Sequence, residues 1–134
     1  MSKVIIIGGG AAGMFAAVHA SDKGHEVHLF EKNEKLGKKL YITGKGRCNI
    51  TNACDVEELF PAVIGNPKFL YSSFYTYTNQ NVIDFFENEG LATKIERGNR
   101  VFPVSDHSSD VIRTLSEAMR KRGVQIHLNQ KVEK

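Results

Sequence analysis

The sequence predicts an α/β fold with a doubly wound, parallel sheet, and three observations support this. A β-branched run at residues 4–7 meets three glycines and continues as a small-residue helical segment at 11–23. A second apolar run follows at 27–30, after a glycine turn. Near the end, candidate caps at 105–110 precede a helix with its core face from Val111, and an alternating strand follows at 124–128. Strand–helix–strand order is typical of parallel sheets, because parallel neighbours need a crossover connection.

The first strand ends in a glycine turn with G-x-G-x-x-G spacing, formed by Gly8, Gly10 and Gly13. Gly8 permits a sharp turn out of the strand, and Gly10 has no Cβ to keep a pyrophosphate from the backbone. Gly13 allows the helix to pack closely on the sheet. The first turn of that helix directs free N–H groups and a partial positive charge at phosphates. The pattern therefore predicts a dinucleotide site.

The second strand ends on an acid, Glu31. A carboxylate at this position accepts hydrogen bonds from both ribose hydroxyls and repels a 2′-phosphate, so it disfavours NADP. A glycine turn that serves packing alone is the alternative. The preceding strand, the following helix and the terminal acid all favour the nucleotide site.

Composition and charge set few further limits. A chain of 134 residues makes one domain, and a net charge of +3 neither demands a nucleic-acid partner nor excludes an anionic ligand. Cys48 and Cys54 are spaced C-x5-C, which is neither a redox nor a zinc pattern, and we predict no metal site.

The apolar stretch 4–18 is interrupted by glycines and is shorter than the about 20 residues that span a bilayer. We expect a soluble, cytoplasmic protein with reduced thiols and no membrane partner.

A long insertion after the second strand separates it from the last helix and strand. We expect core strands at about 3–7, 26–30 and 124–128, and the insertion at about 32–104. The insertion contains a helix at 79–89, for which Asn79 is the expected cap, and a hairpin that turns at Gly98-Asn99. Pro103 lacks an N–H donor and predicts that the second hairpin strand is a sheet edge.

A second motif, GKKLYITGKGRCNITN at 37–52, follows the ribose carboxylate, where a doubly wound fold places the ligand. It concentrates positive charge beside the expected pyrophosphate through Lys38, Lys39, Lys45 and Arg47. A solvated basic loop is the alternative for any single lysine. Asn49 and Asn52 are suited either to a ring edge or to stabilising a turn.

The phrase TGKGRCNITN, the GGGAAG turn and the stretch GNRVFPVSDHSSDV at 98–111 resemble the BaiN-like family of FAD/NAD(P)-dependent oxidoreductases. The resemblance covers the whole chain in order. It implies a Rossmann-like FAD/NAD(P)-binding fold that is incomplete here, because family members are longer and add a domain and a segment that closes over the flavin. By this likeness the chain is an N-terminal part, and the missing C-terminal part of the polypeptide packs on it.

The resemblance also implies FAD in the first nucleotide site, NAD(P)H as a possible electron donor, and a small-molecule substrate without a nucleic-acid partner. It assigns cofactor binding to Gly8, Gly10, Ala11, Ala12, Gly13, Glu31, Lys32, Lys38, Lys39, Gly46, Arg47, Cys48, Asn49 and Val132. Glu31 would hold the adenosine ribose, and the backbone of Val132 would meet adenine. No catalytic residue is identified.

Two other functions stay open. One is a nucleotide-binding fragment without catalysis. The other is an RNA-modifying flavoprotein, against which the small net charge and the lack of a basic–aromatic stripe argue.

Overall fold

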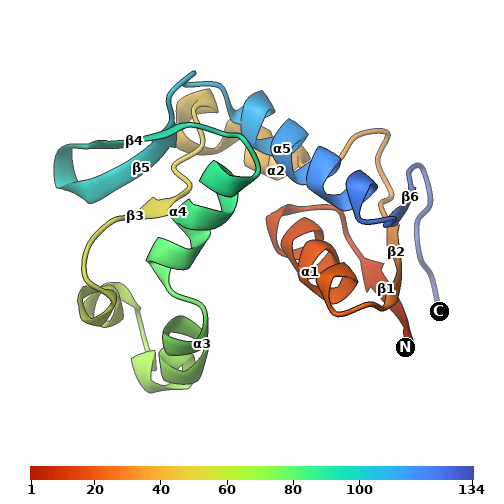
Figure 1. The fold of residues 1–134 in the computed structure, drawn as a ribbon, viewed down its shortest axis with the longest axis horizontal. Helices are drawn as coiled ribbons and strands as arrows, with labels where there is room; N and C mark the ends of the chain where they lie inside the picture. Colours follow the sequence, from red (N-terminus) through yellow and green to blue (C-terminus); the bar gives the residue numbers. More distant parts are fainter. The chain divides into compact units, whose positions relative to one another are not determined.

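A computed structural model describes all residues, 1–134, and divides the chain into two compact units. The first unit comprises Met1–Cys48 and His107–Lys134, and the second comprises Asn49–Asp106. The second unit therefore begins later than the insertion expected at 32. Figure 1 shows the elements of each unit, which are described separately below.

The sheet of the first unit is parallel and has three strands. They are β1 (Lys3–Ile7), β2 (Glu26–Phe30) and β6 (Gln125–His127), in the order β1-β2-β6. Residues Ile7, Phe30 and His127 lie in register at the carboxyl edge. The parallel order and its crossover helices confirm the predicted α/β, Rossmann-like fold class.

Helices cover one face of this sheet. They are α1 (Ala11–Asp22) and α5 (Ser108–Lys121), which lie side by side (Figure 1), with the short α2 (Lys38–Ile42) against α5. Their buried side chains, with those of the sheet, form a core that includes Met14, Val18, Val27, Leu29, Leu115 and Met119. The opposite face is open, since Ile5 and Ile7 of β1 are 59% and 67% exposed. No helix combines the length and apolar composition that crossing a bilayer requires.

The second unit holds a small antiparallel sheet and two α-helices. The sheet has the order β3-β5-β4, and the elements are β3 (Thr51–Asn52), α3 (Tyr71–Thr76), α4 (Asn79–Asn88), β4 (Thr93–Glu96) and β5 (Arg100–Pro103). The predicted hairpin is confirmed, with Gly98 and Asn99 at φ 77° and 59° in its turn. Two 3₁₀ segments, Val56–Ala62 and Pro67–Leu70, precede α3.

The prediction that β5 is an edge strand is wrong, because β5 lies between β3 and β4. Pro103 is the last residue of β5 and is paired with Thr93 of β4. The short β3 pairs only with Arg100 and Val101. The missing N–H of Pro103 therefore interrupts no ladder on that side.

The cap predicted for α4 is also wrong, because Thr78 and not Asn79 is the N-cap. The Thr78 hydroxyl accepts from the Asn81 N–H at 3.1 Å, and the Asn81 side chain accepts from the Thr78 N–H at 2.9 Å. This is a capping box. Asn79 instead donates through Nδ2 to the carbonyls of Asn52 and Cys54, at 2.6 and 2.7 Å, and so ties α4 to β3.

Candidate functional site at the glycine turn

Two glycines of the turn are required by the fold itself. Gly8 has φ 104°, a left-handed value that favours glycine, and its N–H donates to the Phe30 carbonyl at 2.8 Å. A Cβ on Gly13 would overlap the carbonyl oxygen of Gly8. Helix α1 therefore begins directly against the turn that ends β1.

Gly10 is different, because nothing in this chain requires a glycine there. Its φ of −84° and ψ of −171° are open to any residue, and a Cβ would meet no atom within 4 Å. Gly10 is the N-cap of α1, which has no side-chain cap, so the N–H groups of the exposed Ala11 and Ala12 face this open space. Open space before an uncapped helix N-terminus has the form of an anion site.

Gly9 has a structural role that the motif did not predict. A Cβ there would lie 2.6 Å from Leu36 Cδ2 and 3.2 Å from Glu31 Cβ. Its carbonyl accepts from the Gly37 N–H at 2.8 Å. The motif requires glycine at positions 8 and 10 but not at position 9, so the additional glycine is the sequence signal for this close packing.

Glu31 is buried at the end of β2 and holds the turn in place. Its Oε1 accepts from the Gly9 N–H at 2.9 Å and its Oε2 from the Asn33 N–H at 2.6 Å. Burial acts to raise the pKa of Glu31, but the N–H donors of Asn33 and Gly9 outweigh it and hold that pKa below its ordinary value. An ionised carboxylate has about four lone-pair sites, so both oxygens retain capacity for ribose hydroxyls.

The predicted lysines differ in their surroundings. Lys32 follows Glu31 directly and is exposed, and its charge helps to lower the pKa of that carboxyl. Lys39 is exposed on α2. Lys38 is already paired, because its Nζ lies 2.8 Å from Glu34 Oε1.

Val132 lies after β6 in a segment without regular structure. The start of this segment runs beside Glu31, since Gln130 N–H donates to the Glu31 carbonyl and Asn129 N–H to the Asn33 carbonyl, both at 2.9 Å. The Val132 side chain is 44% exposed. The chain thus brings this segment alongside Glu31.

The second motif contains five residues in the left-handed region, of which two are not glycine. Gly37, Gly44 and Gly46 have φ 69°, 55° and 84°, while Lys45 and Cys48 have φ 56° and 59°. A left-handed conformation costs a non-glycine residue about 1–2 kcal/mol. Cys48 is buried beside the half-buried Arg47, and burial raises the pKa of its thiol, an effect that a hydrogen bond with the Thr43 side chain only partly offsets.

Asn49 begins the second unit and has a structural role there. Its Nδ2 donates to the carbonyls of Thr51 and Val101 at 2.9 and 3.1 Å. Asn52 donates in the same way to the Gly98 carbonyl at 2.9 Å. Of the two roles left open for these asparagines, turn stabilisation is the one that these bonds perform.

Comparison with known proteins places this geometry in a family. The model of the HI0933-like protein Rossmann domain matches residues 2–134. The chain belongs to the HI0933-like family. It is 35% identical to the 3-dehydro-bile acid delta(4,6)-reductase of Clostridium scindens over 99% of its own length, and the resemblance to BaiN-like proteins is confirmed. It is also 32% identical, over 98% of its length, to the ribosomal RNA dihydrouridine synthase of Haemophilus influenzae.

A solved structure shows the same fold. The 3-ketosteroid-delta4-(5alpha)-dehydrogenase of Rhodococcus jostii superposes with a TM-score of 0.68 at 13% identity, over 96% of this chain and 38% of that one. Such low identity is evidence for the fold alone. The chain spans about a third of the length of the curated relatives that it matches, 32% of each.

Proposed function

We propose that this chain is the FAD-binding part of a flavin-dependent oxidoreductase and that FAD binds at the glycine turn. The main support for this proposal is Gly10. Neither backbone conformation nor packing requires a glycine there, and it lies beside an uncapped helix N-terminus. Gly8 and Gly13 form the turn, and the N–H groups of Ala11 and Ala12 bind the pyrophosphate. When bound, FAD supplies hydride-transfer chemistry.

In this proposal Glu31 binds the adenosine ribose of the cofactor. Its ionised carboxylate accepts hydrogen bonds from ribose hydroxyls and repels a 2′-phosphate. The segment after β6 lies beside Glu31, which supports an adenine contact to the Val132 backbone.

The other assigned residues act on the phosphates or the flavin. Lys32 and Lys39 are exposed cations that attract the pyrophosphate, and Lys38 contributes after exchange from Glu34. The strained turn Gly46-Arg47-Cys48-Asn49 lies near the pyrophosphate or flavin in this proposal.

The substrate class and the electron donor are part of the same proposal. We propose a small unsaturated or carbonyl-bearing molecule as acceptor and NAD(P)H as donor, supported by the relative named a 3-dehydro-bile acid reductase. Ribosomal RNA is the second candidate, supported by the relatives from Haemophilus influenzae and Escherichia coli that are named ribosomal RNA dihydrouridine synthases.

Further polypeptide packs on this chain in the proposed complete enzyme. The matched relatives are about three times as long, and the open sheet face presents Ile5 and Ile7. Fully burying an exposed side chain of this kind stabilises the covered state by about 1.5–3 kcal/mol. Free thiols at Cys48 and Cys54 fit the cytoplasm.

FAD binding is tested by mixing the protein with FAD, removing free ligand and recording the visible flavin band. We expect retained flavin, with Gly10→Val and Glu31→Ala weakening retention by about tenfold or more. Lys131→Gln, an exposed change outside the proposed site, serves as the matched control. A folded protein that retains no flavin, or equal retention in Gly10→Val, contradicts the proposed site.

Substrate class is tested by supplying NADH or NADPH to the FAD-loaded protein with either a steroid enone or a uridine-containing ribosomal RNA fragment. Reduction of the enone supports the first candidate. Dihydrouridine in the RNA supports the second and overturns the small-molecule assignment.

A further inference from the structure

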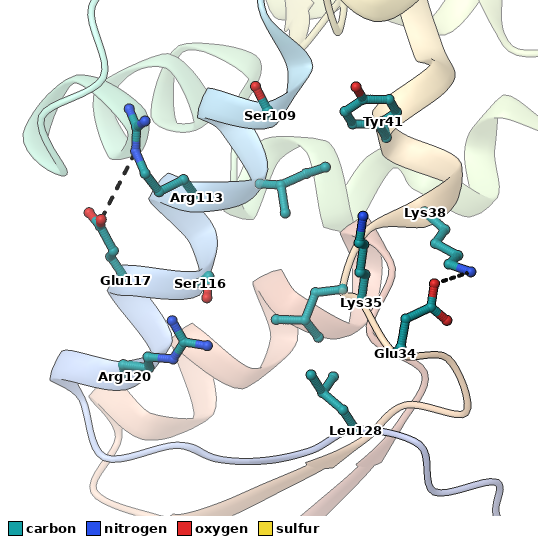
Figure 2. Close-up of a pocket in the computed structure, with 12 residues that line it drawn as sticks. Glu34, Lys35, Lys38, Tyr41, Ser109, Arg113, Ser116, Glu117, Arg120 and Leu128 are labelled. Carbon is teal, nitrogen blue, oxygen red and sulfur yellow. Dashed lines mark ion pairs between the residues drawn. The ribbon is translucent and has the colours of Figure 1, made fainter.

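The first unit contains a cleft away from the glycine turn, and Lys38 is the one residue that it shares with the proposed cofactor site. It has a volume of about 770 Å³ and lies between α5 and the segment that follows β2 (Figure 2). No residue of the glycine turn lines it, and neither does Glu31. Small-molecule sites in proteins usually occupy about 300–1,000 Å³, so the cleft has the size of a ligand site.

Two cations at this cleft have no acidic partner. The Lys35 and Arg120 side chains line it and form no ion pair. At longer range the charge of Lys35 adds to that of Lys38 in lowering the pKa of Glu34. Figure 2 shows Lys35 between α2 and α5, and Arg120 on the side of α5 that faces Leu128. An approaching anion therefore meets two cations that are held in no ion pair.

The other charged groups at the cleft are already paired. Lys38 pairs with Glu34 at 2.8 Å. Arg113 pairs with Asp110 at 2.8 Å and more weakly with Glu117 at 4.0 Å. These contacts set two cations against three carboxylates, so the unpaired positive charge of the cleft comes from Lys35 and Arg120 alone.

The cleft also has an apolar lining and a hydroxyl group. Leu36, Ile112 and Leu128 are partly exposed there, and they come from the loop after β2, from α5 and from the residue that follows β6. Ser116 adds a hydroxyl from the middle of α5. An apolar surface beside unpaired cations is suited to a molecule that has one charged end and one apolar body.

We propose that this cleft binds a small organic anion, a carboxylate or a phosphate monoester on an apolar body, separately from the glycine turn. Lys35 and Arg120 bind the charged end, and Leu36, Ile112 and Leu128 contact the apolar body. Arg120 presents a planar fork of donors that matches either oxyanion.

The test is a titration of the ¹⁵N-labelled protein by NMR with 2-naphthoate, phenyl phosphate and, as an uncharged match, 2-naphthamide. We expect the anions to shift the amide signals of 34–38 and 109–120, and 2-naphthamide to bind about tenfold more weakly. The variant with Lys35→Gln and Arg120→Gln is expected to lose about tenfold in affinity for both anions, while Arg120→Lys, which keeps the charge, loses less. Lys131→Gln is the matched control and is expected to bind as the parent does.

The choice between the two anions identifies the natural headgroup. Tighter binding of 2-naphthoate assigns a carboxylate, and tighter binding of phenyl phosphate assigns a phosphate monoester. Unshifted signals in the cleft, equal affinity for 2-naphthamide, or equal affinity in the folded double variant overturns the proposal. Displacement of 2-naphthoate by FAD would mean that the two ligands share one site and would overturn the proposal of a separate site. If FAD does not bind at all, the proposed function fails, but the anion titration still tests the cleft.

Discussion

The two glycine-rich motifs of this chain use the left-handed region of backbone conformation in opposite ways. In the first motif the left-handed residue is Gly8, which adopts φ 104° without a steric penalty. In the second motif Lys45 and Cys48 adopt left-handed values although each carries a Cβ. The first motif is relaxed and held together by the fold, whereas the second stores strain, which is typical of functional segments.

The first motif separates glycines that the fold needs from one that it does not. Gly8 and Gly13 are required by conformation and by close packing, whereas Gly10 faces open space. A glycine without a structural reason is the sharper indication of a ligand. The prediction with the largest expected effect compares a substitution at Gly13 with one at Gly10.

Gly13→Ala is expected to destabilise the protein by about 3 kcal/mol or to prevent folding, because the new Cβ overlaps the Gly8 carbonyl oxygen. Gly10→Ser is the matched control, and it is expected to change stability by less than about 0.5 kcal/mol, since serine is a good N-cap. Thermal unfolding followed by circular dichroism measures both. Equal unfolding temperatures for Gly13→Ala and the parent would contradict the packing argument.

Glu31→Gln is expected to cost about 2 kcal/mol, because an amide NH₂ replaces one of the oxygens that accept from Gly9 and Asn33. The folded protein lowers the pKa of Glu31, so this contribution is complete above the ordinary value of 4.5 and is lost as pH falls through the lower, folded pKa. Urea unfolding measures the difference between parent and variant at neutral and acidic pH.

That difference is expected to be largest at neutral pH and to shrink below pH 4.5. Glu133→Gln, a change at an exposed side chain, is the control and is expected to leave stability unchanged at both values. A difference that stays constant on acidification would mean that the charge of Glu31 does not stabilise the turn.

Asn49→Ala is expected to cost about 1 kcal/mol, because the variant loses the amide donors to the Thr51 and Val101 carbonyls, of which the second keeps only the Ile50 N–H. Asn66→Ala is the control, since Asn66 caps its 3₁₀ segment without a side-chain bond. Chemical unfolding measures both variants. Retained stability in Asn49→Ala, with weakened flavin retention, would favour the ring-edge role over turn stabilisation.

Local rules predicted the first motif well from the sequence, because each rule involves neighbours along the chain. Gly8, the start of α1 and the strand that ends at Phe30 all follow from such rules. The bonds of Glu31 to Gly9 and Asn33 were not predictable in the same way, because they depend on the distance between two turns after folding.

The errors in the second unit have the same cause. Pro103 indicated an edge strand, but the position of β5 is set by the short β3, which ends its pairing at Val101. Asn79 suits an N-cap as well as Thr78 does, and its contacts with Asn52 and Cys54 decided between them. Competing uses of one side chain are settled by tertiary contacts, which the local sequence does not contain.

The smallest expected effect comes from the strained lysine of the second motif. Lys45→Gly removes the cost of a left-handed conformation, about 1–2 kcal/mol. Glycine also gives the unfolded chain more conformational freedom, which offsets about 0.5–1 kcal/mol of that gain in stability. We therefore expect a gain of about 0.5 kcal/mol in the free energy of unfolding. Lys39→Gly, in the helix α2, is the matched control and is expected to lose about 1 kcal/mol.

A stability gain together with weaker flavin retention would show that Lys45 is kept for binding at the expense of stability. A gain with unchanged retention would assign the strain to the turn alone, and the functional contrast between the two motifs would then rest on Gly10. A loss of stability in Lys45→Gly would mean that the lysine side chain makes contacts that offset its backbone strain. The same pair of variants thus distinguishes strain that serves a ligand from strain that the fold itself compensates.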